Sequence, residues 1–191
     1  MRKICVYGLA GSGKSTVSAM IRQALIERGY HVDILKLAEP MYRLQQIIYR
    51  TAGVEVDLWE HDNRLLRLLA TELRRINPTC IVDDFLARTG TSTADIVIND
   101  DCRDADIDYP AMAGAGFQFV HITCDHEGRT ARVAARGDRT VVADSAATWG
   151  HDRMTANWTI DNSSEDLGRL RHHVDTLVNA WLRQRIGPSA P

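Results

Sequence analysis

The sequence predicts a three-layer α/β/α sandwich built around a five-stranded parallel sheet. Short apolar runs of strand length alternate along the chain with longer stretches whose apolar residues recur at helical spacing. A strand that returns through a helix to a second strand makes the two strands parallel. Because the chain has 191 residues, we expect one domain, residues 1–191, with its own hydrophobic core.

The first strand, loop and helix are the clearest elements. Residues 3–8, KICVYG, form a short apolar run that ends in glycine, which predicts a buried strand. From residue 14 onward apolar residues fall on one helical face until Gly29, a typical helix stop. Residues 31–37, HVDILKL, predict the second strand. Strand, glycine-rich loop, helix and strand therefore follow one another in that order.

Along the chain, helices are expected before, between and after the remaining strands. Three of them precede the third strand, at residues 40–51, 61–76 and 78–88. The other strands are predicted at residues 94–101, 116–124 and 157–162, and a helix at 106–115 joins the first two of these. A last helix should begin with a capping box of Ser163 and Asp166 and bury the apolar face between Leu167 and Leu182.

A complete phosphate-loop motif joins the first strand to the first helix. GLAGSGKS, residues 8–15, matches GxxxxGK[ST] at every fixed position and has the strand before it and the helix after it that the motif requires. Glycines let backbone amides turn toward phosphate oxygens, and the helix N-terminus adds partial positive charge. We expect ATP to be bound here, by Gly8, Ala10, Gly11, Ser12, Gly13, Lys14, Ser15 and Thr16.

Lys14 is one of only three lysines among 23 basic residues. A compact, flexible ammonium can reach the β- and γ-phosphates of a nucleotide, whereas the planar guanidinium of arginine does not fit the same loop. We therefore predict a catalytic role for Lys14. The hydroxyl of Ser15 is expected to bind Mg²⁺.

Asp100 and Asp101 follow the third predicted strand directly. Ligands of a parallel sheet bind beyond the carboxyl ends of its strands, so a carboxylate there can hold Mg²⁺ opposite Ser15. We name Asp101 as the metal residue, although either acid suits the position. The alternative is that both acids cap the next helix.

Three arginines recur at one helical face before a stretch without periodicity, residues 137–152. Arg129, Arg132 and Arg136 have i, i+3 and i+7 spacing, and we place them in a lid at about 126–152. Closing over ATP, they would neutralise charge on the transferring phosphoryl group, so we predict that they are catalytic. The alternative is a solvated charged surface.

A helical insert, about residues 38–90, separates the second strand from the third. It combines several arginines with Tyr42, Tyr49 and Trp59, a mixture suited to holding an anionic, flat phosphate acceptor.

Composition and missing motifs exclude several classes of protein. A formal charge of -2 disfavours nucleic-acid binding, no apolar run is long enough for a membrane span, and four scattered cysteines disfavour zinc or disulfides. We expect a cytoplasmic protein. The NKxD base-reading motif of switch GTPases is absent from the sequence, and AAA and helicase modules are generally longer and need oligomeric arginine fingers, which leaves a small kinase.

The chain resembles the P-loop nucleoside-monophosphate kinases, an adenylate kinase-like group, and within them the deoxynucleoside monophosphate kinase family. Four segments carry the resemblance: LAEPMYRL at 37–44, RLLRLLATELRRINP at 64–78, IVINDDCRDADID at 96–108 and WTIDNSSEDLGRL at 158–170. The resemblance implies ATP with Mg²⁺, and it gives Asp101 and Arg103 the family's acid and arginine. Acceptor-binding candidates are Glu39, Arg43, Arg64, Glu72 and Arg103.

These expectations combine into one hypothesis, the ATP-dependent transfer of the γ-phosphoryl group to a nucleoside 5′-monophosphate. The partner would be this small acceptor, without nucleic acid or membrane, and a homodimer is compatible with the sequence. Two alternatives stay open: a P-loop kinase of another small metabolite or natural-product intermediate, and a nucleotide-gated regulatory ATPase.

Overall fold

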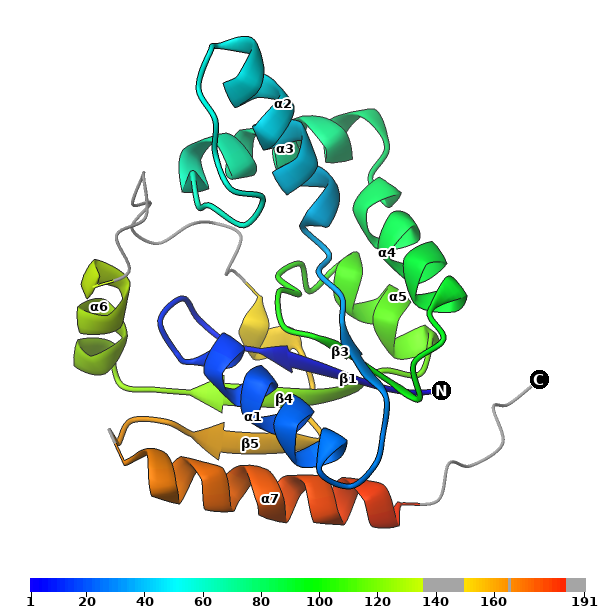
Figure 1. Cartoon of the computed structure of the whole chain (residues 1–191), viewed down its shortest axis with the longest axis vertical. Coiled ribbons are helices and arrows are strands. Elements are labelled where there is room, and N and C mark those ends of the chain that lie inside the picture. The colour runs from blue at the N-terminus through cyan, green and yellow to red at the C-terminus, as the bar shows by residue number, and fades with distance from the viewer. Residues whose placement is uncertain (136–149, 165, 185–191) are drawn as a thin grey trace.

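A five-stranded, all-parallel sheet in the order β2-β3-β1-β4-β5 forms the centre of the computed structural model, which describes residues 1–135, 150–164 and 166–184 (Figure 1). The strands are β1 (Arg2–Tyr7), β2 (Val32–Ile34), β3 (Ile96–Asn99), β4 (Gln118–Thr123) and β5 (Trp158–Asp161). The helices are α1 (Lys14–Ile26), α2 (Glu39–Thr51), α3 (Asn63–Ile76), α4 (Cys80–Thr91), α5 (Asp108–Gly114), α6 (His126–Ala135), the short 3-10 helix η2 (His151–Arg153) and α7 (Leu167–Arg183). The α/β sandwich predicted from the sequence is confirmed.

Two apolar cores lie on opposite faces of the sheet. Along β1, Ile4 and Val6 point into a core shared with α1 and α7, while Cys5 and Tyr7 point into a core shared with α4 and α5. In Figure 1, α1 and α7 accordingly lie on one side of the sheet and α4 and α5 on the other. Period-two alternation of buried side chains on a sheet covered on both faces produces this division.

The chain leaves β1 and β3 toward opposite faces, although these strands are neighbours. The loop after β1 leads into α1, and the loop after β3 leads into α5. Adjacent strands whose connections diverge in this way open a crevice at their carboxyl ends, where ligands of parallel sheets bind. The fold therefore places a candidate site beyond β1 and β3.

Within the helical insert, α2 and α3 project away from α7 (Figure 1). Arg74 of α3 holds the insert to the sheet-bearing part of the chain through an ion pair with Asp108 of α5, N to O 2.8 Å. Burial raises the pKa of the Asp108 carboxyl, and the Arg74 guanidinium acts against this rise.

The beginning of α7 differs from the expected capping box. Asp166 itself is the N-cap, and its Oδ1 accepts hydrogen bonds from the amides of Gly168 and Arg169 at 2.8 and 3.1 Å. Ser163 lies too far ahead of the helix to cap it, and its hydroxyl accepts from the amide of Asp125 instead. The predicted pairing of Ser163 with Asp166 is therefore wrong, while the apolar face expected for this helix is buried at Leu170, Val174, Leu177, Val178 and Trp181.

None of the helices within the described ranges is long and apolar enough to cross a membrane.

Candidate active site

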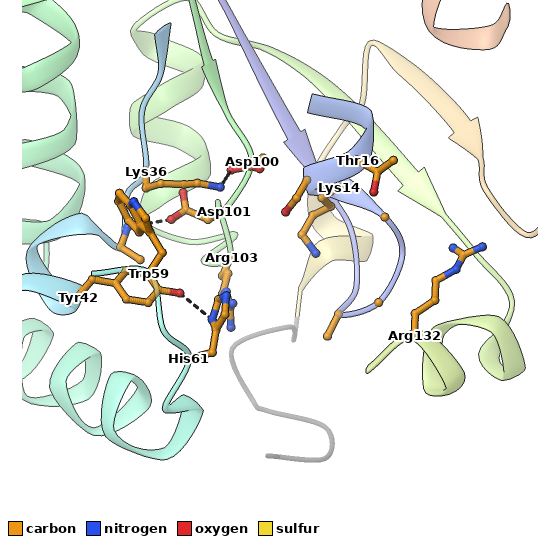
Figure 2. Close-up of a pocket in the computed structure, with 15 residues that line it drawn as sticks. Lys14, Thr16, Lys36, Tyr42, Trp59, His61, Asp100, Asp101, Arg103 and Arg132 are labelled. Carbon is orange, nitrogen blue, oxygen red and sulfur yellow. Dashed lines mark hydrogen bonds and ion pairs between the residues drawn. The ribbon is translucent and has the colours of Figure 1, made fainter. Parts of the chain in front are cut away.

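A cavity of about 430 Å³ lies at the carboxyl ends of β1, β2 and β3 (Figure 2). Its lining comes from the glycine-rich loop, from the segments that follow β2 and β3, from the insert and from α6. The residues are Ala10, Gly11, Gly13, Lys14, Ser15, Thr16, Lys36, Ala38, Tyr42, Trp59, His61, Asp100, Asp101, Arg103 and Arg132. The cavity therefore lies where the strand order predicts a crevice, beyond the carboxyl ends of β1 and β3.

The glycine-rich loop packs so closely on β4 and β5 that only glycine fits at two positions. Gly8 has φ +151°, and a Cβ there would lie 2.4 Å from the carbonyl oxygen of Ile122. Gly13 has φ +95°, and its Cβ would lie 2.2 Å from Nδ2 of Asn162, which donates to the Ser12 carbonyl at 2.8 Å. Both backbone conformations are ones that other residues rarely adopt. The contacts with Ile122 and Asn162 therefore hold the glycine-rich loop in one conformation.

Lys14 is the first residue of α1, and its Nζ donates to the carbonyls of Gly8 and Leu9, each at 2.9 Å. Six of the eight residues predicted to bind ATP line the cavity, and the other two, Gly8 and Ser12, lie behind it. Ser12 is fully buried, and its hydroxyl has no hydrogen-bond partner among the described residues.

The two acids after β3 have different surroundings. Asp101 accepts from the amides of Leu37 and Ala38 at 2.8 and 2.9 Å and from Nδ2 of Asn99 at 2.6 Å. β2 ends at Ile34, earlier than the sequence predicts: the amide of Leu35 still donates to the Ile98 carbonyl of β3 at 2.9 Å, but those of Leu37 and Ala38 donate to the Asp101 side chain instead of to a strand. Asp100 is buried, and its carboxylate contacts the ammonium of Lys36.

The alternative that these acids cap the next helix is wrong. No side chain caps α5, and Oδ1 of Asp104 accepts from the amides of Asp106 and Ile107, both at 2.9 Å, just before that helix. Asp100 and Asp101 are directed instead toward the segment after β2.

Oxygen ligands for Mg²⁺ are present on both sides of the cavity. In nucleotide sites Mg²⁺ is bound through one or two protein oxygens together with phosphate oxygens. The Ser15 hydroxyl and the Asp100 carboxylate fit this requirement, since both line the cavity and the Asp100 carboxylate has fewer hydrogen bonds than that of Asp101. No group of three or more His, Cys, Asp or Glu side chains suited to a metal occurs within residues 1–135, 150–164 and 166–184.

Two of the three predicted lid arginines, Arg129 and Arg132, lie within the described residues and extend from α6 toward the glycine-rich loop and the segment after β5. Arg132 donates to the Asn162 carbonyl through both terminal nitrogens at 3.1 Å, and Arg129 donates to the Ala10 carbonyl at 3.4 Å. Arg132 lines the cavity, but it lies on the other side of the loop from Asp100 (Figure 2). Arg136 and most of the predicted lid, residues 136–149, lie outside the described residues.

Of the five predicted acceptor residues, the structure brings only Arg103 to the cavity. Glu39 pairs with Arg43 at 2.6 Å and with Arg88 at 3.1 Å, away from the cavity lining. Glu72 of α3 forms an exposed pair with Arg75, and Arg64 is not part of the lining either.

An aromatic wall, which we define as Tyr42, Trp59 and His61, lines the side of the cavity away from the glycine-rich loop (Figure 2). The hydroxyl of Tyr42 lies 2.8 Å from Nδ1 of His61, and its ring meets that of Trp59 nearly edge-on, with centroids 5.2 Å apart. Gln45, which is buried on α2, donates to the Glu60 carbonyl at 2.6 Å and so holds this loop against the helix.

Sequence reasoning missed Lys36 and His61 as site residues. A signal for Lys36 was available, because Lys36, like Lys14, is one of only three lysines in the chain. The spacing of His61 carries no such signal, since it approaches Tyr42 only after the loop has folded back on α2.

Three rings lie against one another at the end of β1. Tyr7 is parallel to His121, with centroids 4.7 Å apart, and perpendicular to His151 at 5.6 Å. The pKa of His151 is lowered to about 4, chiefly by burial and then by the charges of Lys14, His121 and Arg103. Burial also lowers the pKa of His121 and raises that of Tyr7 to about 12.

We expect His151 to make the fold sensitive to acid. Its pKa is about 4 when folded and near the ordinary 6.5 when unfolded, so between these values the unfolded chain binds more protons. The stabilisation is complete above pH 6.5 and is lost as the pH falls toward 4, by about 2 kcal/mol between pH 7.5 and 5. Urea unfolding at pH 7.5, 6 and 5 measures it.

The His151→Leu variant should lose most of this pH dependence, whereas His172→Gln, at an exposed position on α7, should keep it. Equal slopes for wild type and His151→Leu would contradict the assignment.

Comparison with known proteins supports the fold. The model of a family described as AAA domain, AAA_18, matches residues 4–148. No curated protein matches the sequence. Similar solved structures include the shikimate kinase from Acinetobacter baumannii in complex with shikimate, with 14% identity, coverage of 98% of this chain and 96% of that chain, and a TM-score of 0.57. A gluconokinase from Sinorhizobium meliloti 1021 has 15% identity, coverage of 96% and 98%, and a TM-score of 0.53.

At such identities the likeness shows the fold, which is the one expected for P-loop kinases, and it does not identify the acceptor. The resemblance to nucleoside-monophosphate kinases is thus confirmed only at the level of the P-loop fold that these kinases share. The matching family model is described as an AAA domain, and the phosphate loop and its supporting sheet are common to AAA modules and kinases, so length alone does not separate these classes. The chain belongs to the AAA domain family AAA_18 and has the α/β fold of P-loop phosphotransferases.

Proposed function

We propose that the protein transfers the γ-phosphoryl group of ATP to a nucleoside 5′-monophosphate. The observation that carries the proposal is the composition of the cavity. The phosphate loop forms one side of the cavity. Two cations, Lys36 and Arg103, form the other side together with the aromatic wall. A phosphate between the cations and a base against the wall would satisfy both features of the acceptor side.

In this reaction an oxygen of the acceptor phosphate forms a bond to the γ-phosphorus of ATP. The bond from that phosphorus to the β–γ bridging oxygen breaks, and ADP leaves with the electron pair. An acceptor phosphate is ionised at neutral pH, so its attacking oxygen needs no general base. Positioning and charge stabilisation by Lys14, the loop amides and Arg103 supply the catalysis.

Mg²⁺, when bound, would neutralise charge on the β- and γ-phosphate oxygens. We assign its protein ligands to Ser15 and Asp100. Asp101, the residue that the sequence favoured, is assigned to holding the Leu37–Ala38 turn through its hydrogen bonds. Arg132 is kept as the lid cation nearest to ATP, because it lines the cavity.

A coupled assay of ADP release tests the proposal directly. The panel contains the common nucleoside and deoxynucleoside monophosphates, together with shikimate and gluconate, since enzymes of similar fold are named for these two acids. Release of ADP that depends on a nucleoside monophosphate is expected. Binding of ATP without turnover of any nucleoside monophosphate would contradict the assigned acceptor.

Trp59 should determine how tightly the acceptor binds. Its side chain is 47% exposed beside the cavity and can offer a ring face to a base. We expect Trp59→Leu to raise the KM for the acceptor about tenfold, or about 1.4 kcal/mol, and to leave the KM for ATP within twofold. Leu68→Ala, at an exposed position on α3 outside the lining, is the control. An equal rise in both KM values would argue against stacking.

A further inference from the structure

Lys36 follows β2, and its side chain extends toward Asp100, which follows the neighbouring strand β3 (Figure 2). The side chain of Asp100 is only 2% exposed, whereas that of Lys36 is 27% exposed and so keeps access to the cavity. Lys36 is one of two lysines in this cavity, in a chain with only three.

The backbone on both sides of Lys36 is fixed. Its carbonyl accepts from Nη2 of Arg88 at 2.8 Å, and the next two amides donate to the Asp101 carboxylate. Arg88 is itself held by Glu39. Any movement at this position therefore belongs to the four-carbon side chain, whose ammonium can exchange one partner for another without a change in the fold.

The charges around the cavity give Lys36 two competing partners. Three N–H donors already compensate the carboxylate of Asp101. Asp100, by contrast, has Lys36 as its cation. When Asp100 binds Mg²⁺, as assigned above, the ammonium loses part of this attraction, and a half-buried ammonium then favours a new anion.

We propose that Lys36 binds the phosphate of the acceptor and that Asp100 holds its ammonium in the cavity before the acceptor binds. The inference rests on the proposed function, because it requires an acceptor that carries its own oxyanion. Lysine suits this exchange better than arginine, whose planar fork would hold the carboxylate through two bonds.

Calorimetric binding in the presence of Mg²⁺ and a non-hydrolysable ATP analogue tests the role of Lys36 separately from turnover. The probes are the four deoxynucleoside monophosphates and the matching deoxynucleosides, which lack the phosphate. We expect Lys36→Met to weaken binding of the best monophosphate by 10- to 100-fold and to leave binding of its deoxynucleoside and of ATP within threefold. Lys3→Met, at a lysine that bonds the Ala115 carbonyl away from the cavity, should bind like wild type.

The double variant Lys36→Met, Asp100→Asn separates substrate binding from simple charge compensation. If Lys36 binds the acceptor, the double variant stays as weak as Lys36→Met. Recovery of wild-type affinity would show that Lys36 only compensates Asp100, and it would overturn the inference. So would a wild-type protein that binds none of the monophosphates. Binding that depends on Lys36 without any phosphoryl transfer would instead support the inference and refute the proposed function.

Discussion

Replacing Lys14 with methionine lowers kcat at least 10³-fold, which corresponds to about 4 kcal/mol of transition-state stabilisation. The side chain stays similar in length, but the ammonium that donates to the carbonyls of Gly8 and Leu9 at the mouth of the loop is lost. The charge that spreads over the γ-phosphoryl oxygens then has no lysine to compensate it. Initial rates of ADP release at saturating ATP and acceptor measure the effect.

Two controls accompany this variant. Circular dichroism and the urea midpoint show whether the chain still folds, and Lys3→Met removes a lysine from β1 without touching the cavity. A rate within tenfold of wild type would exclude Lys14 as a catalytic residue. A wild-type protein that binds ATP and releases no ADP with any acceptor would instead favour the nucleotide-gated regulator.

Replacing Gly8 with alanine destabilises the fold by at least about 3 kcal/mol and abolishes ATP binding. The added Cβ would lie 2.4 Å from the Ile122 carbonyl oxygen and 2.9 Å from the Ser12 hydroxyl, and the backbone there has φ +151°. Since β1 and β4 are paired neighbours, the loop cannot withdraw from this contact without disturbing the sheet. Urea unfolding and ATP titration measure the two effects.

Gly53→Ala is the matched control for Gly8→Ala. Gly53 also has a positive φ, +76°, but nothing lies within 4 Å of its Cβ position. The control therefore carries only the conformational cost, about 1 kcal/mol, and leaves ATP binding intact. Equal destabilisation by the two variants would show that close packing behind the loop is not what requires glycine.

The elements that could be predicted are those with a local cause. The strand before the phosphate loop and the helix after it could be predicted from hydrophobic periodicity and from a motif whose glycines let the backbone amides turn toward phosphate oxygens. The acids after β3 could be placed at the cavity because parallel strands end at a common edge. Even so, the sequence could not distinguish the amide-bonded Asp101 from the lysine-paired Asp100, since their partners come from residues about 64 positions away.

The acceptor side was harder to predict because it depends on how a loop folds over a helix. Glu39 and Arg43 looked suitable in type and spacing, but at i, i+4 they pair with each other, as such residues commonly do on a helix surface. The aromatic wall comes from α2 and from residues 59 and 61, which meet through the bonds of Tyr42 and Gln45 rather than through any sequence period.

The hydrogen bonds from Leu37 and Ala38 to Asp101 have a consequence for how this enzyme class can diversify. They join the ends of β2 and β3 into one rigid unit, so Lys36 and Asp100 keep their spacing whatever the tilt of the insert. The groups proposed to bind phosphate and Mg²⁺ are thereby separate from the loop at residues 52–62 that carries Trp59 and His61. Substitutions in that loop can accumulate and change which acceptor is chosen, while the distance over which the phosphoryl group travels is preserved.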